Sequence, residues 1–122
     1  GIVPGGGIAY LNLIPAVRAV KAEGDEAFGV EVLARALRAP AERLLCNAGL
    51  YPPVILDELQ RRGPNYGYNV MTGEVVDMLE AGIMDAAKVL RVALETAVSG
   101  ATMAFTAGAL VLRRKPPESL EP

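Results

Sequence analysis

The stretch Asp77-Met78-Leu79-Glu80-Ala81-Gly82-Ile83-Met84-Asp85 precedes the longest helical pattern in the chain and decides how the sequence is divided. Gly82 predicts a short helical turn and loop between Asp77 and Met84, because glycine readily adopts turn conformations. Asp85 is of a residue type that favours the N-cap of a helix. We therefore predict a long helix from about Ala86 to Thr106. Its inward stripe is expected to comprise Leu90, Leu94, Ala97, Val98, Ala101 and Phe105.

Before this stretch, apolar residues recur mainly at helical spacing. A first helix is predicted after the triplet Gly5-Gly6-Gly7, with a kink or restart near Asn12 because Pro15 has no backbone N–H. A second helix is expected after Gly24, with Asp25 as its N-cap. The apolar face of this second helix is expected to carry Phe28, Val32, Ala36 and Leu37.

Prolines predict where two further helices begin, since proline is favoured in the first turn of a helix. Pro40 is expected in the first turn of a helix that carries Leu44 and Leu45 and ends near Gly49. Pro52 and Pro53 are expected to start another helix that ends at Gly63. Its inward residues are expected to be Val54, Ile55 and Leu59.

Strand character appears after these helices and again near the end of the chain. Residues 65–70 are aromatic and glycine-punctuated, and they predict either a strand or a tight turn, with Glu74-Val75-Val76 as a possible return strand across Thr72-Gly73. A final strand is predicted at 109–112, and it needs a partner from another segment or chain because two-stranded ladders are marginal in water. Residues 115–122 predict a disordered tail. The expected fold class is therefore mainly α with a few short β-strands.

Composition excludes several classes of function. The net charge of -2 argues against a nucleic-acid partner, which favours a basic face. Histidine is absent and Cys46 is the single cysteine, so we expect no metal site, a reducing cytoplasmic setting and a buried Cys46. The uncharged run from Thr96 to Leu112 is short and rich in small residues, so no membrane span is expected.

The apolar content is high for a chain of this length. Hydrophobic residues make up 52% of the 122 residues, although small domains have much surface to cover with polar groups. We therefore expect some apolar surface to belong against a missing partner. The start at Gly1 also suggests a chain excised from a longer one.

Three motifs, in order, resemble the group I (GroEL-type) chaperonins. Residues 1–7 resemble the pattern G-(IV)-V-x-G-G-G, and residues 65–69 with Thr72 resemble the nucleotide loop Y-G-(YF)-N-A-A-T. Residues 77–85 with Lys88-Val89 resemble D-M-I-E-A-G-I-(IL)-D-P-(TA)-K-V. The likeness covers residues 1–114 and implies the C-terminal part of the helical equatorial domain of the chaperonin fold.

The resemblance carries the family's function with it. Group I chaperonins form stacked seven-membered rings that bind ATP in the equatorial domain and enclose unfolded proteins under a co-chaperonin lid. The partners implied are other chaperonin subunits, a co-chaperonin and unfolded protein clients. The resemblance implies a longer chaperonin chain that contains this segment, which we call the full-length parent. ATP with Mg is implied for the full-length parent, whereas this segment by itself is expected to require no cofactor.

The resemblance assigns the sugar-and-base side of an ATP site to five residues, namely Gly6, Asn69, Val70, Met71 and Asp85. Gly6 is expected to contact the nucleotide, with a tight turn as the alternative. Asn69 either pairs with a polar edge or braces its turn. Val70 and Met71 replace two alanines, and either narrow the base pocket or pack in a core. Met71 has a third alternative, in which its flexible thioether packs on the base. Asp85 is expected to accept hydrogen bonds from ribose hydroxyls while also capping its helix.

No catalytic residue is expected in this chain. The family's D-G-T-T-T loop, its T-x-G-P segment and its catalytic aspartate have no counterpart here, so the chain alone is not expected to hydrolyse ATP. The alternative is a stand-alone helical interaction module, or a divergent chaperonin paralogue without ATPase activity, which the departures at Val70 and Met71 favour. In either case we expect the isolated chain to self-associate through exposed apolar surface.

Overall fold

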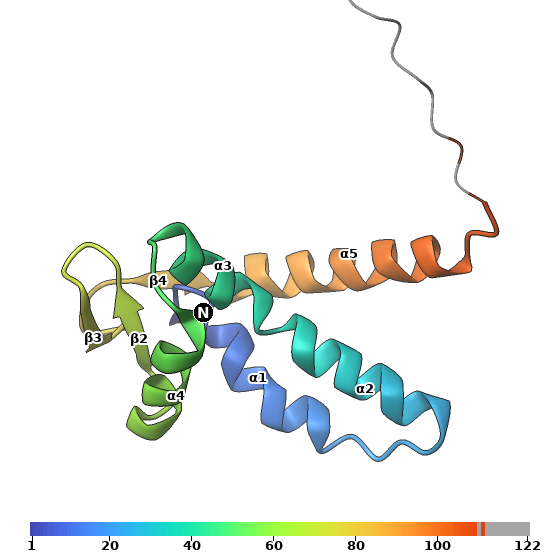
Figure 1. Cartoon of the computed structure of the whole chain (residues 1–122), viewed down its shortest axis with the longest axis horizontal. Coiled ribbons are helices and arrows are strands. Elements are labelled where there is room, and N and C mark those ends of the chain that lie inside the picture. The colour runs from blue at the N-terminus through green and yellow to red at the C-terminus, as the bar shows by residue number, and fades with distance from the viewer. Residues whose placement is uncertain (110, 112–122) are drawn as a thin grey trace, which may run out of the picture. The chain divides into compact units, whose positions relative to one another are not determined.

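The computed structural model describes residues 1–109 and 111, and it is mostly helical with a few short strands (Figure 1). The predicted fold class is therefore confirmed. The elements in chain order are β1 (Ile2–Pro4), α1 (Ile8–Arg18), α2 (Asp25–Ala36), α3 (Ala39–Asn47), α4 (Pro52–Arg62), β2 (Tyr66–Asn69), β3 (Glu74–Asp77), β4 (Met84–Ala86) and α5 (Ala87–Thr106).

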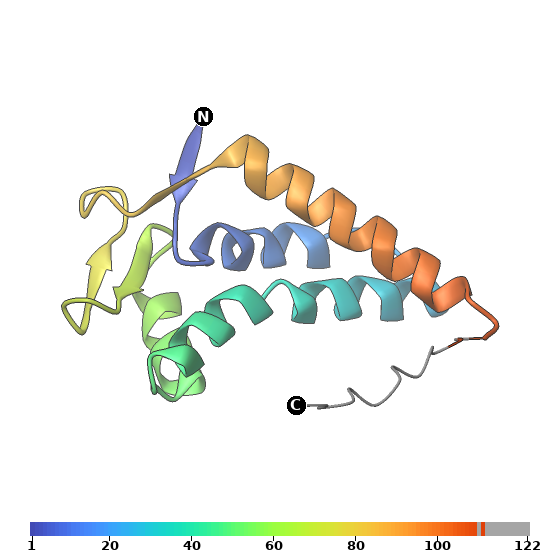
Figure 2. The same ribbon diagram turned by 90° about the horizontal axis from the view of Figure 1, so that it is seen from above.

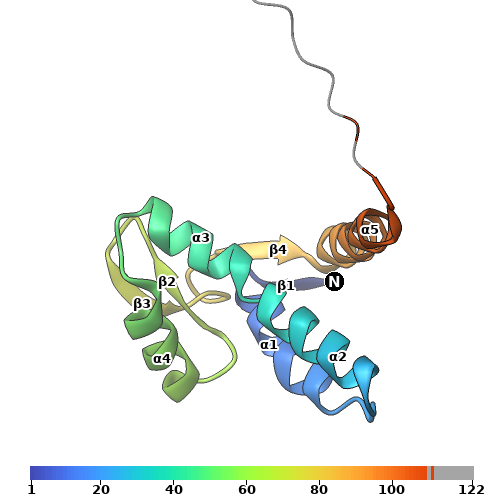
Figure 3. The same ribbon diagram turned by 45° about the vertical axis from the view of Figure 1, so that its right-hand side comes forward.

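The strands pair in two separate antiparallel ladders (Figure 3). β2 and β3 form the predicted hairpin, in which Asn69 lies opposite Glu74. β1 pairs with β4, so that Val3 lies opposite Asp85 although the two residues are far apart in the chain. The second ladder brings the glycine triplet next to the segment that follows β3.

The chain divides into two compact units, of which the first is Gly1–Leu90 and the second begins at Arg91. The core of the first unit is formed by side chains from α1, α3 and α4, together with a side chain from the turn that follows β3. Its buried members are Ile8, Ala41, Leu45, Leu56, Leu59 and Met78. Tyr66 and Tyr68 of β2 are half-buried against this cluster. The core therefore joins the start of α1 to the β2–β3 hairpin.

Helices α1 and α2 lie side by side within the first unit (Figure 2). The prediction of a restart near Asn12 is wrong, because α1 runs without a break from Ile8 to Arg18 with Pro15 inside it. Pro15 is exposed. The N-cap of α2 is Gly24 rather than Asp25, which instead occupies the first turn, where its charge favours the helix dipole.

The start of α1 requires glycine. Gly7 is its N-cap residue and has φ of 79°, a left-handed conformation that disfavours side chains. A Cβ at Gly7 would lie 2.7 Å from the backbone nitrogen of Ala41 in α3. The triplet thus combines an unusual backbone conformation with close packing of α1 on α3.

The stretch 77–85 forms the predicted short turn around Gly82, in which the Ala81 N–H donates to the Asp77 carbonyl at 2.9 Å as in one turn of a helix, but Asp85 departs from the prediction. Asp77 ends β3, and its Oδ1 accepts hydrogen bonds from the N–H groups of Leu79 at 2.9 Å and Glu80 at 3.1 Å. The side chain of Asp77 therefore caps the predicted turn. Asp85 lies inside β4, and α5 begins at Ala87, so the assignment of Asp85 as N-cap is wrong. The reason is that pairing with β1 holds this residue extended.

Several predicted inward faces are exposed in this chain. Phe28 and Val32 of α2 are 73% and 60% exposed, Val54 of α4 is exposed where its neighbour Leu56 is buried, and Cys46 is exposed rather than buried. No described residue of α5 is buried. From the predicted stripe of α5, four residues are exposed, namely Ala97, Val98, Ala101 and Phe105. Ala36 is exposed as well, so of the predicted face of α2 only Leu37 is buried.

The predicted strand at 109–112 includes Leu110 and Leu112, and these two residues and the predicted tail at 115–122 lie outside the described residues. Within the described part of the chain, no helix has the length and apolar character needed to cross a bilayer.

Candidate functional site

A cavity of about 400 Å³ lies between the glycine turn, α3, α4 and the tip of the hairpin. Four of the five predicted site residues line it, namely Gly6, Asn69, Val70 and Met71. The rest of its wall is largely apolar and includes Leu44, Leu45, Tyr68, Met78 and Ile83. Residues more than sixty positions apart in the sequence therefore meet around one hollow of a size that holds a small molecule.

Gly6 contributes backbone rather than a side chain to this cavity. Its φ of 64° places it in the left-handed region, directly before the first turn of α1. Within the described part of the chain, the N–H groups of Gly6 and Gly7 donate no hydrogen bond to another protein group. Free N–H groups at a helix N-terminus favour an anion, since the helix dipole adds positive potential there. This end of the cavity therefore suits a negatively charged ligand.

The hairpin tip contributes Asn69, Val70 and Met71. Asn69 Oδ1 accepts a hydrogen bond from the Met71 N–H at 3.0 Å, so Asn69 braces its turn. Its Nδ2 donates to no protein group in residues 1–109 and is free for a ligand. The side chains of Val70 and Met71 are 52% and 90% exposed, so the alternative that they pack in a core is wrong. The two side chains stand at the cavity instead.

Asp85 stands apart from the other four predicted residues. It does not line the cavity, and its carboxylate makes no hydrogen bond or ion pair with any described residue. Its position in β4 is nonetheless tied to the glycine turn, because β4 pairs with β1 and the Gly5 N–H donates to the Ile83 carbonyl at 2.9 Å. A ligand that uses all five residues has to extend from the cavity towards β4.

Sequence reasoning missed two residues that shape the site. Asp77 caps the turn that returns the chain from β3 to Ile83, and Met78 supplies a buried part of the cavity wall. The signal for Asp77 was available, because aspartate commonly accepts hydrogen bonds from N–H groups two and three residues later. Nothing in the local sequence around Met78 indicated which partners it contacts.

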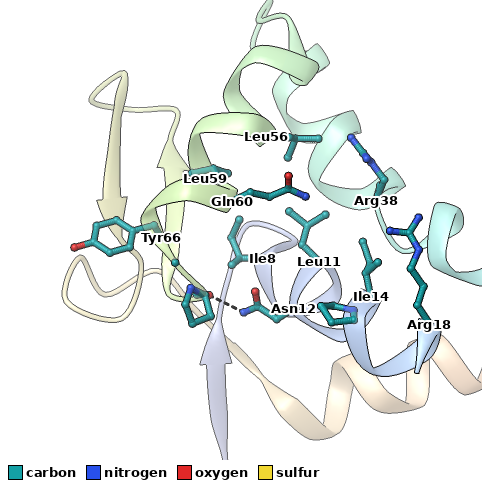
Figure 4. Close-up of a pocket in the computed structure, with 13 residues that line it drawn as sticks. Ile8, Leu11, Asn12, Ile14, Arg18, Arg38, Leu56, Leu59, Gln60 and Tyr66 are labelled. Carbon is teal, nitrogen blue, oxygen red and sulfur yellow. Dashed lines mark hydrogen bonds between the residues drawn. The ribbon is translucent and has the colours of Figure 1, made fainter. Parts of the chain in front are cut away.

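A second cavity, of about 520 Å³, lies between α1 and α4 (Figure 4). Its wall is mostly apolar, with Ile8, Leu11, Leu56 and Leu59 inside, and the Asn12 amide closes one side by donating to the Pro64 carbonyl at 2.6 Å. It contains none of the five predicted residues. We therefore regard the first cavity as the candidate site.

Charged groups near these cavities are mostly solvated. Arg18 forms a two-pronged ion pair with Glu31 that links α1 to α2, with nitrogen–oxygen distances of 2.8 and 3.1 Å. The hydrogen bond from Arg18 lowers the pKa of Glu31, and the same bond raises the pKa of Arg18. No group of three or more histidine, cysteine, aspartate or glutamate side chains within the described residues is arranged to hold a metal ion.

Comparison with known proteins identifies the family. The sequence model of the TCP-1/cpn60 chaperonin family matches residues 1–114, so the chain belongs to that family. Two similar solved structures are also chaperonins. One is an open-state monomer of a group II chaperonin from Methanococcoides burtonii, with 33% identity, a TM-score of 0.79 and 87% of this chain covered. The other is a group III chaperonin in the open state, with 29% identity, a TM-score of 0.82 and 91% of this chain covered.

The match is to a part of each of these proteins. It spans 28% of the group II chain and 24% of the group III chain. The family resemblance stated from the motifs is thus confirmed at the level of the chaperonin family. The similar structures belong to groups II and III, so the GroEL-type branch is not singled out.

Proposed function

We propose that residues 1–114 supply the C-terminal part of the ATP-binding equatorial domain of a protein-folding chaperonin. The observation that carries the proposal is the meeting of Gly6, Asn69, Val70 and Met71 around one cavity. These residues were assigned to a nucleotide from motif resemblance alone. Their convergence from two distant segments, at a helix N-terminus with free N–H groups, supports a common ligand.

Each residue has a role that its surroundings permit. The N–H groups at Gly6 and Gly7 favour the negative charge of a phosphate. Asn69 Nδ2 offers a donor to a polar edge, while Val70 and Met71 offer apolar contact to a flat base or a sugar. Asp85, with a carboxylate free of protein partners in the described residues, is suited to accept hydrogen bonds from ribose hydroxyls.

Hydrolysis requires more than these residues offer. Phosphoryl transfer needs a phosphate cradle with a metal ion and a carboxylate that orients water. The described residues do not contain a cluster of acidic side chains that fits Mg, so we derive no step through a metal ion. We place these groups in other parts of the parent chain, and we assign this segment to binding and positioning.

The finer features of the parent belong to the same proposal. Stacked rings of seven subunits, a co-chaperonin, unfolded clients and the group I branch rest on the motif resemblance, whereas a cytoplasmic location rests on the single cysteine, Cys46. The group II and group III similarities make the branch a matter for experiment. A ring of seven that requires a separate lid protein for refolding would support group I, and a different ring size would contradict it.

The test compares the full-length parent with the isolated 122-residue chain. We expect the parent to bind Mg-ATP in isothermal titration and to hydrolyse it, and the isolated chain to show no turnover. Robust hydrolysis by the isolated chain would contradict the division of roles. A parent that binds no nucleotide would contradict the ATP site.

The second candidate is a helical interaction module or a paralogue without ATPase activity. The exposure of Phe28 and Val32 on one face of α2 favours it, because large exposed apolar groups often mark contact surfaces. A parent that assembles with other subunits but binds no nucleotide would support this candidate.

A further inference from the structure

Met78 is the largest fully buried side chain of the described residues, and it lies between the glycine turn and β2. A Cβ built on Gly6 would lie 2.8 Å from the Met78 Cε. A Cβ built on Gly67 of β2 would lie 2.6 Å from both Cγ and Sδ of Met78. The thioether chain therefore occupies the space that two glycines leave open, and it touches both sides of the candidate site.

The backbone of Met78 is fixed on the same two sides. Its N–H donates to the Asn65 carbonyl at 3.0 Å, just before β2, and its carbonyl accepts from the Ile83 N–H at 2.8 Å. The Ile83 carbonyl in turn accepts from the Gly5 N–H at 2.9 Å. The route from the hairpin to the glycine turn thus passes through Met78 both by backbone hydrogen bonds and by side-chain contact.

We propose that Met78 is a positioning residue for the ligand of this cavity. Its side chain forms part of the cavity wall, and the contact of its terminal methyl group with Gly6 sets where the free N–H groups of the turn stand relative to Asn69. Methionine suits this place because its unbranched, flexible chain fills an irregular gap without a branch that would meet either glycine. The inference rests on the proposed function and deepens it.

A buried methionine can also serve stability alone, so the test needs a matched control. Leu56 provides one, because it is buried to a similar degree in the same core but lines the other cavity. Met78→Ala and Leu56→Ala each remove a buried side chain, and both lower the free energy of unfolding. Only Met78→Ala is expected to change ligand affinity.

The experiment uses the full-length parent, with ADP as the probe in isothermal titration and a denaturant titration of each variant in parallel. We expect Met78→Ala to weaken ADP binding about tenfold, which corresponds to about 1.4 kcal/mol of binding free energy. Leu56→Ala is expected to leave ADP affinity unchanged. Met78→Leu, which conserves volume, is expected to fold and to weaken ADP binding only about threefold, and it keeps the test valid if Met78→Ala does not fold.

A double-mutant cycle tests the contact itself. Gly6→Ala is expected to weaken ADP binding strongly when Met78 is present, because the new methyl group meets the Met78 Cε, and less strongly in the Met78→Ala background. Additive effects in this cycle, or an unchanged affinity for both Met78 variants in a parent that binds ADP, would overturn the positioning role. Failure of the wild-type parent to bind ADP would overturn the proposed function instead.

Discussion

Oδ1 of Asn69 accepts a hydrogen bond from the backbone N–H of Met71 at 3.0 Å, while the Asn69 carbonyl accepts one from the Gly73 N–H at 2.8 Å. One residue thus closes the hairpin turn twice, through its side chain and through its backbone. The side-chain nitrogen has no protein partner in the described residues. Asn69 is therefore both a brace for the turn and a free donor at the cavity, and the two roles belong to different atoms.

These roles separate by mutation. Asn69→Asp keeps an oxygen for the Met71 N–H but replaces the donor with a second acceptor, so we expect the free energy of unfolding to change by less than about 0.5 kcal/mol. ADP affinity of the full-length parent should fall about tenfold, because a polar contact to the ligand is lost. Isothermal titration and denaturant unfolding measure the two quantities. If neither Asn69→Asp nor Asn69→Ala changed the affinity for ADP, the role of Asn69 would be limited to bracing the hairpin turn.

Asp77 and Asp85 offer a second contrast, because of these two only Asp77 has side-chain hydrogen-bond partners among the described residues. Asp77→Ala removes the acceptor of two N–H groups in the turn at 78–82, and we expect it to lower the free energy of unfolding by about 1–2 kcal/mol. Asp85→Ala removes no bond to the described protein and should cost less than about 0.5 kcal/mol. Thermal and urea unfolding of the 122-residue chain check both values. A larger loss of unfolding free energy for Asp85→Ala would indicate that Asp85 caps α5 after all.

The helical half of the fold was predictable from the sequence because its signals are local. Pro40, Pro52 and Pro53 each stand in the first turn of a helix, and glycines stand at or near the helix ends, as the sequence indicates. The hairpin at 66–77 was also predictable, because its sequence is aromatic and punctuated by glycines.

The misassigned elements depend on contacts between distant residues. The local sequence predicts Asp85 as a helix N-cap, but Asp85 pairs with Val3 and is therefore part of a strand. Phe28 and Val32 read as an inward face, because helical spacing shows that residues share a face but does not show what that face meets. The same holds for the site, where resemblance assigned Gly6 and Asn69 but no pattern indicated that Met78 lies beside Gly6.

The packing of Gly7 against α3 predicts a large effect for a small substitution. Gly7→Ala places a Cβ within 3 Å of the Ala41 backbone and in the left-handed region, so we expect a loss of about 3 kcal/mol or more in the free energy of unfolding. Gly82→Ala is the matched control, because its φ is also positive at 72° but open space surrounds the new methyl group. Gly82→Ala should lower the free energy of unfolding only by the cost of holding alanine in the left-handed conformation, which is about 1–2 kcal/mol. Equal losses for the two variants would show that the contact with α3 is relaxed in solution.

The ion pair between Arg18 and Glu31 predicts a small pH dependence. Because the hydrogen bond from Arg18 lowers the pKa of Glu31 in the folded chain, the pair stabilises the fold above the ordinary pKa of glutamate. That stabilisation is lost as the pH falls through the lowered pKa, and it does not change again near neutral pH. The difference in unfolding free energy between wild type and Glu31→Gln should therefore be present at neutral pH and shrink in acid. A difference that is constant over this range would contradict the linkage.

The exposed face of α2 leads to the last prediction, which concerns the isolated chain. Phe28 and Val32 are four residues apart, so they share one face of the helix, and both are largely exposed. Exposed groups of this size favour association in water, because contact removes their apolar area from solvent. We expect the 122-residue chain to sediment as concentration-dependent oligomers, and the double variant Phe28→Ser/Val32→Ser to sediment closer to a monomer.

Val54 provides the control for this experiment, because it is 65% exposed on α4, away from that face. Val54→Ser removes a similar apolar group, and it should leave the oligomers of the isolated chain largely intact if the α2 face drives association. An equal effect of both changes would indicate non-specific association through the whole apolar surface. A wild-type chain that stays monomeric at high concentration would contradict self-association altogether, and with it the expectation that this face requires cover from a partner.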